Sequence, residues 1–315
     1  MRLAFVFPGQ GSQSVGMLNG YAGNAVVEED IRRADNSLGF PISQLIAEGP
    51  AETLGLTVNT QPAILATSVA FYDAWLAAGG PKPVVMAGHS LGEYSALTAA
   101  GVFSLEEAVK LVRFRAEAMQ TAVPVGVGGM AAIIGLSDET VIEVCREAGA
   151  AGIVEAVNFN SPGQVVIAGE KAGIAKAIEL AKTKGCRRAI ELPVSAPFHS
   201  SMLKPAQEKL AARLAETTVH TPQIPVIANV DVQEHATADG IRDALARQAA
   251  SAVQWVRTIE RMKNEGVTDI VECGPGKVLC GLIRRIAPEI RCYTIGDAAQ
   301  LETTLGKIRE AAAAQ

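Results

Sequence analysis

The feature that most constrains this chain is a tight turn between an apolar run and a helix-forming segment. Residues 83–87 are apolar, Gly88-His89-Ser90-Leu91-Gly92 follows, and helix-forming residues occupy 93–97. A G-x-S-x-G turn is so sharp that it favours glycine on both sides of the serine, and it exposes the hydroxyl at the end of a strand. The first N–H groups of the helix then face developing negative charge. The pattern predicts a nucleophilic Ser90, with an ordinary strand-to-helix turn as the alternative.

Length and composition place the chain among large globular proteins. It has 315 residues, 49% of them hydrophobic, which suffices for one large domain or one domain that carries a smaller one. The formal net charge of -5 is spread without a block of like charge. This balance argues against a nucleic-acid surface and against a polybasic membrane anchor.

Cysteine usage and hydropathy indicate a soluble protein of the reducing cytoplasm. The five cysteines are odd in number, scattered and without C-x-x-C spacing, so we expect free thiols rather than a disulfide framework or a thiolate metal site. The apolar start at 3–7 is cut by Pro8 and Gly9, too short for a signal sequence. No segment reaches the roughly 18 apolar residues that a membrane span needs.

Short β-rich runs alternate with helical patterns over most of the chain. This alternation predicts an α/β fold with a mainly parallel sheet and helices on both faces. The expected strands are 3–7, 84–87, 226–229, 268–272 and 291–295, and the expected helices are 60–78, 91–100, 104–122, 202–217, 256–265, 276–286 and 299–313.

The middle of the chain has a different order of elements. After a Gly/Pro-rich break at 123–129, a strand, a helix, two strands, a helix and a strand are expected up to residue 192. This is the βαββαβ order of a ferredoxin-like unit. We therefore expect a small domain at 125–193 inserted into a large domain made of 1–124 and 194–315. A ligand cleft is expected between the two.

A serine nucleophile needs a base, and four histidines are available. His199 follows the loop 195–198, just after the small domain closes, so it is expected at the edge of the cleft. His220 and His235 lie in polar stretches and are expected at the surface, while His89 belongs to the turn of the nucleophile. The pair of Ser90 and His199 is the predicted catalytic pair, and packing of His199 in a loop is the alternative. No aspartate stands out as a third member.

The loop after the first strand is Gly-rich but does not match a nucleotide-binding pattern. Ser14 stands where the third glycine of G-x-G-x-x-G would be, and no Walker loop is present. Backbone N–H groups at such a strand end suit an oxyanion hole. Gln10 is the candidate donor there, together with Leu91 after the nucleophile.

Two arginines lie on the helix expected at 104–122. Ser104 and Glu107 form a capping box at its start. Arg113 and Arg115 are about 200° apart on a helix, so one can be solvated while the other is buried. An arginine facing the cleft would bind a carboxylate through a bidentate fork. The alternative is that both are surface arginines paired with neighbouring glutamates.

With these residues in place, the chain closely resembles the malonyl-CoA:acyl-carrier-protein transacylases of fatty-acid synthesis and the acyltransferase domains of polyketide synthases. The resemblance runs from end to end through six separated motifs. These are Phe7-Pro8-Gly9-Gln10-Gly11-Ser12-Gln13, Gln61-Pro62-Ala63, Gly88-His89-Ser90-Leu91-Gly92-Glu93, Asn158-Phe159-Asn160-Ser161-Pro162-Gly163-Gln164, Pro197-Phe198-His199-Ser200 and Glu272-Cys273-Gly274-Pro275-Gly276-Lys277-Val278-Leu279.

The resemblance implies an α/β-hydrolase-like large domain with a ferredoxin-like insertion, and it implies roles for single residues. Ser90 would take the malonyl group from coenzyme A, His199 would act as base and then acid, and Arg115 would hold the malonyl carboxylate. The family orients its histidine through a carbonyl group, which falls on Gln248 in this chain. Its oxyanion hole falls on Gln10 and Leu91. The remaining substrate-binding candidates are His89, Asn158, Asn160 and Phe198.

Phe198 precedes His199, as in the malonyl-selective members that this sequence resembles. Methylmalonyl-selective members carry serine there, so the ring would exclude an α-methyl group, worth about 1 to 3 kcal/mol. The resemblance further implies an acyl carrier protein as thiol acceptor, with its phosphopantetheine arm. No metal, nucleotide or flavin cofactor is expected, and a monomer suffices.

Acyl carrier proteins are acidic, so a basic docking rim is expected by this resemblance. One candidate cluster lies at the edge of the small domain and another near the last large-domain helices, and ordinary solvated faces are the alternative for both. The clusters are Lys182, Lys184, Arg187 and Arg188, and Lys277, Arg284 and Arg285.

Two other functions compete with the transacylase at this point. A serine thioesterase or hydrolase would use the same elbow, and it would lack a preference for acyl groups with a free carboxylate. A non-catalytic docking module for carrier proteins is a third reading. The presence of Ser90, His199 and Arg115 together argues against it.

Overall fold

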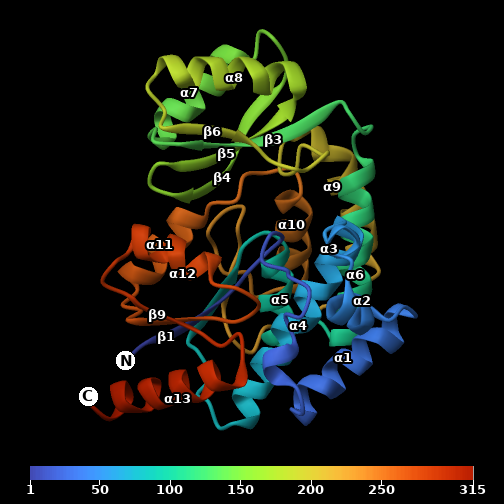
Figure 1. Cartoon of the computed structure of the whole chain (residues 1–315), viewed down its shortest axis with the longest axis vertical. Helices are drawn as coiled ribbons and strands as arrows, with labels where there is room; N and C mark the ends of the chain where they lie inside the picture. Colours follow the sequence, from blue (N-terminus) through green and yellow to red (C-terminus); the bar gives the residue numbers. More distant parts are fainter. Residues whose placement is uncertain (315) are drawn as a thin grey trace.

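The computed structural model describes residues 1–314, in two lobes (Figure 1). The larger lobe holds a five-stranded sheet of order β7-β2-β1-β8-β9, in which every pair is parallel. The strands are β1 (Leu3–Phe7), β2 (Val85–Gly88), β7 (Val226–Ile227), β8 (Asp269–Glu272) and β9 (Arg291–Thr294). The expected α/β fold with a parallel sheet is confirmed, and so are its five strands.

Helices cover both faces of this sheet because alternate residues of the strands are apolar on both sides. On β1, Leu3, Phe5 and Phe7 pack into one core, while Ala4 and Val6 pack into another. The first core is shared with α1 (Ala25–Leu38), α2 (Ile42–Glu48), α3 (Ala51–Leu54), α4 (Thr57–Ala77), α5 (Leu91–Ala99), α6 (Leu105–Thr121), α9 (Lys204–Ala215), α10 (Ala238–Gln248) and α13 (Ala298–Ala313). The second is shared with α11 (Trp255–Asn264) and α12 (Val278–Ile286).

The smaller lobe is an antiparallel sheet of order β4-β5-β3-β6. Its elements follow the expected βαββαβ order, and the exact limits 125 and 193 of an inserted domain stay a prediction. They are β3 (Gly128–Ile134), α7 (Asp138–Ala148), β4 (Val154–Ser161), β5 (Gln164–Glu170), α8 (Lys171–Thr183) and β6 (Arg188–Glu191). Two short 3-10 helices complete the chain, η1 (Asn19–Tyr21) and η2 (Ser201–Leu203).

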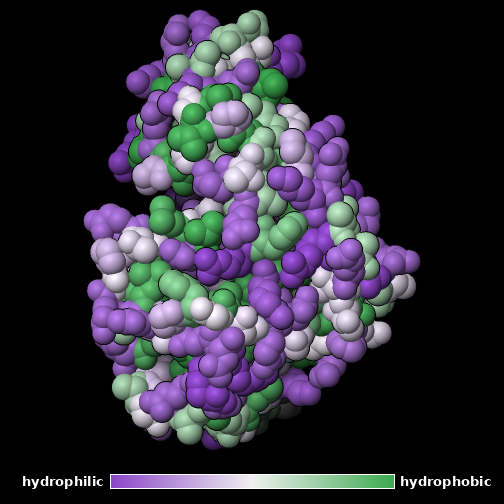
Figure 2. Space-filling view, turned by 90° about the vertical axis from the view of Figure 1, so that its right-hand side faces the viewer, coloured by the Kyte–Doolittle hydropathy of each residue, from purple (hydrophilic) through white to green (hydrophobic). Residues whose placement is uncertain are grey.

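The two faces of the small sheet have different partners. One face packs against α7 and α8, with Ile133 and Ile167 in its core. The other face carries Met130 and Val166, which cluster with the side chain of Phe198. In the space-filling view a notch separates the two lobes at one edge (Figure 2). The sheet face that carries Met130 and Val166 therefore faces the larger lobe.

A backbone link joins the lobes directly. The N–H of Val253, in the segment after α10, donates to the carbonyl of Val157 in β4 at 2.8 Å, and the N–H of Phe159 donates back to the carbonyl of Val253 at 3.1 Å. This short parallel bridge fixes β4 beside the large lobe.

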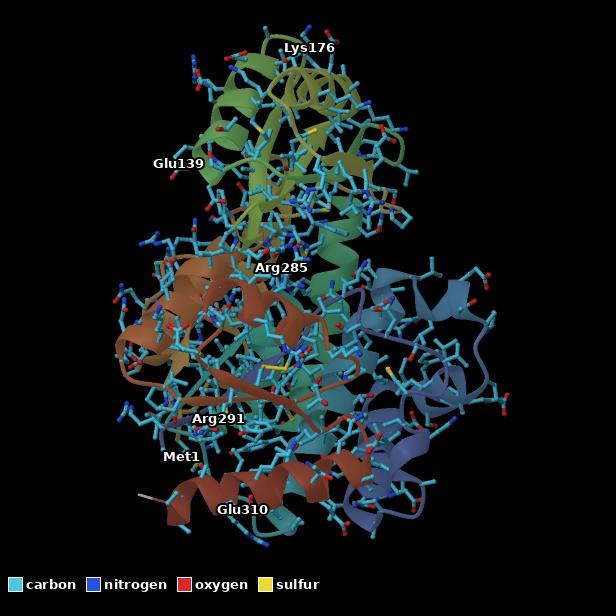
Figure 3. All side chains as sticks on the ribbon, turned by 60° about the vertical axis from the view of Figure 1, so that its left-hand side comes forward. Met1, Glu139, Lys176, Arg285, Arg291 and Glu310 are labelled. Atoms are coloured by element: carbon cyan, nitrogen blue, oxygen red, sulfur yellow. A yellow bond between two sulfur atoms is a disulfide. The ribbon has the colours of Figure 1, made fainter. Side chains whose placement is uncertain are left out.

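The expectation of five free thiols was wrong for two of them. Cys280 and Cys292 form a disulfide, visible in Figure 3, while Cys145, Cys186 and Cys273 are free. Cys280 lies in the first turns of α12 and Cys292 lies on β9, the strand that follows this helix. The turn after α12 returns the chain past the helix, so the two residues come together although 12 positions separate them in the sequence.

Four helices were missing from the expected list: α1, α2, α3 and α10. Two of them carry readable start signals, since Asn24 caps α1 and Thr237 caps α10 through side-chain oxygens that accept backbone N–H groups. No helix among residues 1–314 has the length and apolarity needed to cross a membrane.

Candidate active site

The turn around Ser90 is built as the sequence predicts, at the end of β2 and the start of α5. Ser90 has φ +52° and ψ -111°, a backbone conformation that costs a non-glycine residue about 1 to 3 kcal/mol. A Cβ at Gly88 would lie 1.9 Å from the backbone of Gly92, and a Cβ at Gly92 would lie 2.0 Å from the carbonyl oxygen of Phe7. Glycine is therefore required at both positions by close backbone contact.

Asn229 holds this strained turn from the neighbouring loop after β7. Its Oδ1 accepts the N–H of Ser90 at 2.8 Å, and its Nδ2 donates to the carbonyl of Gly88 at 2.7 Å. The side chain is fully buried. Sequence reasoning missed Asn229, because nothing in its local pattern shows that the loop 228–233 returns to the nucleophile.

The predicted base lies against the nucleophile. Nε2 of His199 is 2.7 Å from Oγ of Ser90, and Nδ1 is 2.9 Å from the backbone carbonyl oxygen of Gln248. A carbonyl can only accept, so Nδ1 carries the proton and Nε2 is free to take one from the hydroxyl. Burial, and secondly the charge of Arg115, lower the pKa of His199 from 6.5 to about 3. The imidazole is thus neutral at physiological pH, as a base must be.

Arg115 lies on the buried side of α6, and Arg113 lies on its solvent side. Arg115 is only 1% exposed, and its Nη2 donates to Oγ of Ser90 at 3.1 Å and to Oε1 of Gln248 at 2.9 Å. Arg113 instead approaches Glu117 at 3.8 Å. The helix therefore separates the two arginines as its geometry requires, and the surface alternative does not hold for Arg115.

Further contacts orient the Arg115 guanidinium. Nη1 donates to Oε1 of Gln61 at 2.8 Å, and the group lies 5.2 Å from the ring centre of Tyr94. Gln61 in turn donates to Thr57, whose hydroxyl donates to Oε1 of Gln10. Within residues 1–314, Nε of Arg115 has no hydrogen-bond acceptor. This nitrogen is buried, and Nη2 is the guanidinium nitrogen that lies beside Ser90.

The two predicted oxyanion donors lie on adjacent strand ends. Phe7 at the end of β1 is in register with Gly88 at the end of β2, so the loop that carries Gln10 runs beside the turn that carries Leu91. Both residues line the cavity at Ser90. Neither backbone N–H donates to an acceptor within residues 1–314. Two unused donors at the carboxyl edge of the sheet suit a developing oxyanion.

The cavity at Ser90 lies between the lobes and measures about 150 Å³. An apolar cavity of this size holds benzene, so the space fits a group of about six heavy atoms. Met130, Leu192, Val194 and Phe198 form its apolar wall. The large lobe contributes Gln10, Gln61, His89, Ser90, Leu91, Arg115, Met119 and His199.

Of the three remaining polar candidates for substrate binding, two line the cavity and one does not. Asn158 lines the cavity, and its buried Oδ1 has no hydrogen-bond partner within residues 1–314. His89 also lines the cavity, with Nε2 2.7 Å from Oδ1 of Asn160. Asn160 itself is not part of the cavity wall and contacts His89 instead. Asn160 was expected near the acyl pocket, and it reaches the cavity only through its contact with His89.

Residues 4–294 match the sequence model of the acyl transferase domain. The chain belongs to the acyl transferase family. It is 48% identical to the malonyl CoA-acyl carrier protein transacylase of Escherichia coli K12 over 305 residues, which cover 96% of this chain and 99% of that protein. It is 42% identical to the protein of the same name from Bacillus subtilis, over 98% of both chains.

Solved structures of this acyl transferase family agree with the fold over nearly the whole chain. An acyl-carrier-protein S-malonyltransferase from Burkholderia pseudomallei is 58% identical, with a TM-score of 0.96 and coverage of 97% of this chain and 100% of that one. A malonyl transacylase in complex with its type II polyketide acyl carrier protein is 46% identical, with a TM-score of 0.96, over 98% and 100% of the chains.

The depressed pKa of His199 predicts the pH dependence of acyl loading. Because the folded imidazole stays neutral down to about pH 3, kcat/KM for acylation of Ser90 is expected to stay level between pH 7 and 5. The free energy of unfolding, in contrast, depends on pH. Below pH 6.5 the unfolded state binds a proton at this histidine that the folded state does not, so the protein becomes less stable as the pH is lowered. Stopped-flow loading, with circular dichroism at each pH as a folding control, tests this. A decline centred at 6.5 would contradict it.

Proposed function

We propose that this chain transfers the malonyl group from malonyl-CoA to the phosphopantetheine thiol of an acyl carrier protein, through a malonyl ester of Ser90. The observation that carries the proposal is the buried guanidinium of Arg115, 3.1 Å from the nucleophilic oxygen. A cation at this place selects acyl groups that end in a carboxylate. The name of the relatives and the cavity size agree with a malonyl unit, which has six heavy atoms.

The first half-reaction begins when Nε2 of His199 takes the proton of the Ser90 hydroxyl. The serine oxygen attacks the thioester carbonyl, and the N–H groups of Gln10 and Leu91 stabilise the oxyanion. When the C–S bond breaks, the thiolate of coenzyme A leaves with the proton from His199. The backbone carbonyl of Gln248 holds the imidazole in the required tautomer and stabilises its protonated form.

The second half-reaction reverses these steps with a different thiol. His199 takes the proton of the phosphopantetheine thiol, the thiolate attacks the ester carbonyl, and Ser90 recovers its proton as the C–O bond breaks. The apolar wall at Met130, Val194 and Phe198 shields the ester from water. Transfer rather than hydrolysis follows from that shield.

Removal of the Arg115 side chain tests the proposal. Arg115→Ala is expected to lower kcat/KM for malonyl loading by roughly tenfold to one hundredfold or more, because each charge-assisted hydrogen bond contributes about 1.5 to 3 kcal/mol. Loading of acetyl-CoA is expected to become the faster reaction. Intact-protein mass spectrometry after brief mixing measures both adducts. Arg113→Ala is the matched control, since it removes a solvated arginine two positions away; equal malonyl preference in both variants would overturn the proposal.

Phe198 is proposed to exclude an α-methyl group. Its ring lines the cavity beside His199 and packs against the small sheet. Phe198→Ser is expected to raise loading of methylmalonyl-CoA relative to malonyl-CoA by roughly 10- to 200-fold. Competition between the two thioesters, read by adduct mass, measures the ratio. Unchanged rejection of methylmalonyl would show that another side chain fills this space.

The carrier is proposed to dock on the basic cluster of Lys277, Arg284 and Arg285, all exposed. Arg285 lies where the lower lobe meets the upper one (Figure 3), and the next residue, Ile286, packs against the core of the small sheet. The cluster Lys182, Lys184, Arg187 and Arg188 lies along the small lobe, where Lys184 already pairs with Glu147.

Charge reversal separates the two clusters. Changing Lys277, Arg284 and Arg285 to glutamate is expected to lower kcat/KM for the carrier about tenfold or more at low salt, because steering by complementary charge speeds association. As a control, loading of malonyl from malonyl-CoA without carrier shows whether the variants still acylate Ser90 normally. The same reversal at Lys182, Arg187 and Arg188 is the comparison, and a larger loss there would place docking on the small lobe.

A further inference from the structure

A carboxylate is buried directly beneath the nucleophile, and the reaction above does not use it. Glu93, in the first turn of α5, is 2% exposed. Its Oε1 accepts the backbone N–H of Asn229 at 2.6 Å, and its Oε2 accepts an N–H of the Gln248 side chain at 2.9 Å. It does not line the cavity at Ser90. Burying a carboxylate is costly, so two donors at such short distances indicate a site built for it.

The two partners of Glu93 hold the two halves of the catalytic machinery. Asn229 holds the strained turn at Ser90 through its side chain. Gln248 accepts Nδ1–H of His199 with its backbone carbonyl and accepts Nη2–H of Arg115 with its side-chain oxygen. One carboxylate therefore fixes the neighbours of the nucleophile, the base and the guanidinium.

The Gln248 amide has only one acceptable orientation while Glu93 is in place. Its NH2 group donates to Glu93 and also to the backbone carbonyl of Ser90 at 3.0 Å. If the amide were turned over, its oxygen would face these two acceptors and its NH2 would face the guanidinium of Arg115. Each of those contacts is repulsive, since donors would meet donors and acceptors would meet acceptors. Glu93 thus ensures that an oxygen faces Arg115.

This arrangement places a carboxyl group near Arg115 without direct contact. Among its hydrogen-bond partners Arg115 has neutral oxygens only, from Gln61, Ser90 and Gln248. Glu93 lies one residue further away, on the other side of the Gln248 amide. A carboxylate in direct contact with the guanidinium would compete with the substrate's own carboxylate. With the amide between them, no carboxylate of the protein occupies a hydrogen-bonding position of the guanidinium.

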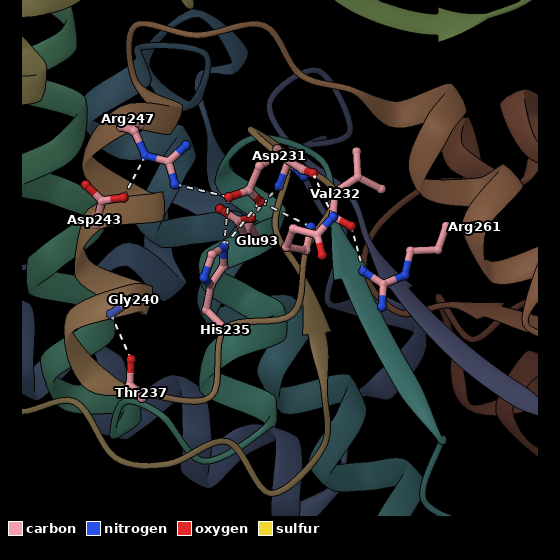
Figure 4. Close-up of polar contacts among 11 residues, drawn as sticks. Glu93, Asp231, Val232, His235, Thr237, Gly240, Asp243, Arg247 and Arg261 are labelled. Atoms are coloured by element: carbon pink, nitrogen blue, oxygen red, sulfur yellow. Dashed lines mark hydrogen bonds and ion pairs between the residues drawn. The ribbon is translucent and has the colours of Figure 1, made fainter.

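The surroundings of Glu93 contain one further acidic group. Asp231 lies beside it in Figure 4, and its carboxylate is held by Arg247 at 3.1 Å and by His235 at 3.0 Å. Burial raises the pKa of Glu93 to about 8, while the N–H of Asn229 and the charge of Arg115 act in the opposite direction. Both oxygens of Glu93 accept hydrogen bonds in the structure, so the geometry of these contacts defines its role as an acceptor.

We propose that Glu93 is a positioning residue for recognition of the substrate carboxylate, acting through the side-chain amide of Gln248 on Arg115. The inference rests on the proposed function, because it assigns to Glu93 a part in the selection that Arg115 performs. Its prediction concerns the ratio of kcat/KM for malonyl-CoA to kcat/KM for acetyl-CoA, since this ratio does not depend on the fraction of folded enzyme.

Glu93→Gln keeps the shape and replaces one acceptor oxygen with an NH2 donor. The new amide offers one acceptor to two donors, so either Asn229 or Gln248 loses its partner, and Gln248 is released to turn over. The malonyl to acetyl ratio is expected to fall at least tenfold, and any loss from a disturbed turn at Ser90 is expected to affect both thioesters alike. Pre-steady-state loading of the full-length protein by both thioesters measures the two constants.

Glu272→Gln is the matched control. Glu272 is also a fully buried carboxylate, and it accepts two backbone N–H groups, from Leu279 and Cys280, away from the cavity. It should change thermal stability without changing the ratio. Gln248→Leu breaks the same link from the other side, so it is expected to lower the ratio as Glu93→Gln does. The malonyl to acetyl ratio of the double variant Glu93→Gln, Gln248→Leu should be no lower than that of either single variant, because both changes break the same link.

Equal losses for malonyl-CoA and acetyl-CoA in Glu93→Gln, or no loss for either, would overturn the inference. If Glu93→Gln does not fold, an unchanged ratio in Gln248→Leu would overturn it instead. Arg115→Ala, measured alongside, separates this failure from a failure of the proposed function. If the preference for malonyl-CoA over acetyl-CoA is lost in Arg115→Ala but kept in Glu93→Gln, only the role of Glu93 is rejected. If Arg115→Ala keeps this preference, selection of the carboxylate by Arg115 is itself rejected.

Discussion

The site depends on a guanidinium that is buried without a carboxylate in direct contact. Taking a charge out of water costs several kcal/mol, and here the cost is offset by hydrogen bonds to Gln61, Gln248 and Ser90 and by the ring of Tyr94. Most of these partners are neutral acceptors with fixed orientations. They hold Arg115 in place while leaving its charge available, which a direct ion pair would not do.

The rest of the architecture places that charge beside Ser90, the proposed nucleophile. A parallel sheet brings the loop after β1 and the turn after β2 to one edge, where backbone N–H groups gather. The antiparallel sheet and the segment after it then supply an apolar wall over this edge through Met130, Leu192 and Val194. We therefore expect polar selection from the large lobe, and limits on size and water from the apolar wall.

Much of this was readable in the sequence because it depends on local patterns. The turn at Ser90, the capped helix of Arg115 and the βαββαβ order each need only neighbouring residues to be recognised. The pairing of His199 with Ser90 was predicted from the place of His199 just after the small domain, whereas the carbonyl of Gln248 came from the family resemblance, since its loop lies far from both in the chain.

What could not be predicted depends on tertiary contact. Asn229 and Gln61 lie in segments whose return to the site no local pattern shows, and Glu93 is visible only as the last residue of a motif until its two donors are known. The Cys280–Cys292 pair was missed because an odd, scattered set of cysteines gives no pairing. The helix α10 could have been found from its Thr237 cap.

In the proposed reaction, Ser90 carries the malonyl group between two thiols. Intact-protein mass spectrometry of the wild type and of Ser90→Ala, first with malonyl-CoA and then with a phosphopantetheine-bearing carrier protein, tests it most directly. We expect a malonyl adduct on the wild type alone, which disappears as the carrier gains the same mass. An adduct that persists in Ser90→Ala, or one that is lost to water at the same rate with and without carrier, would contradict it.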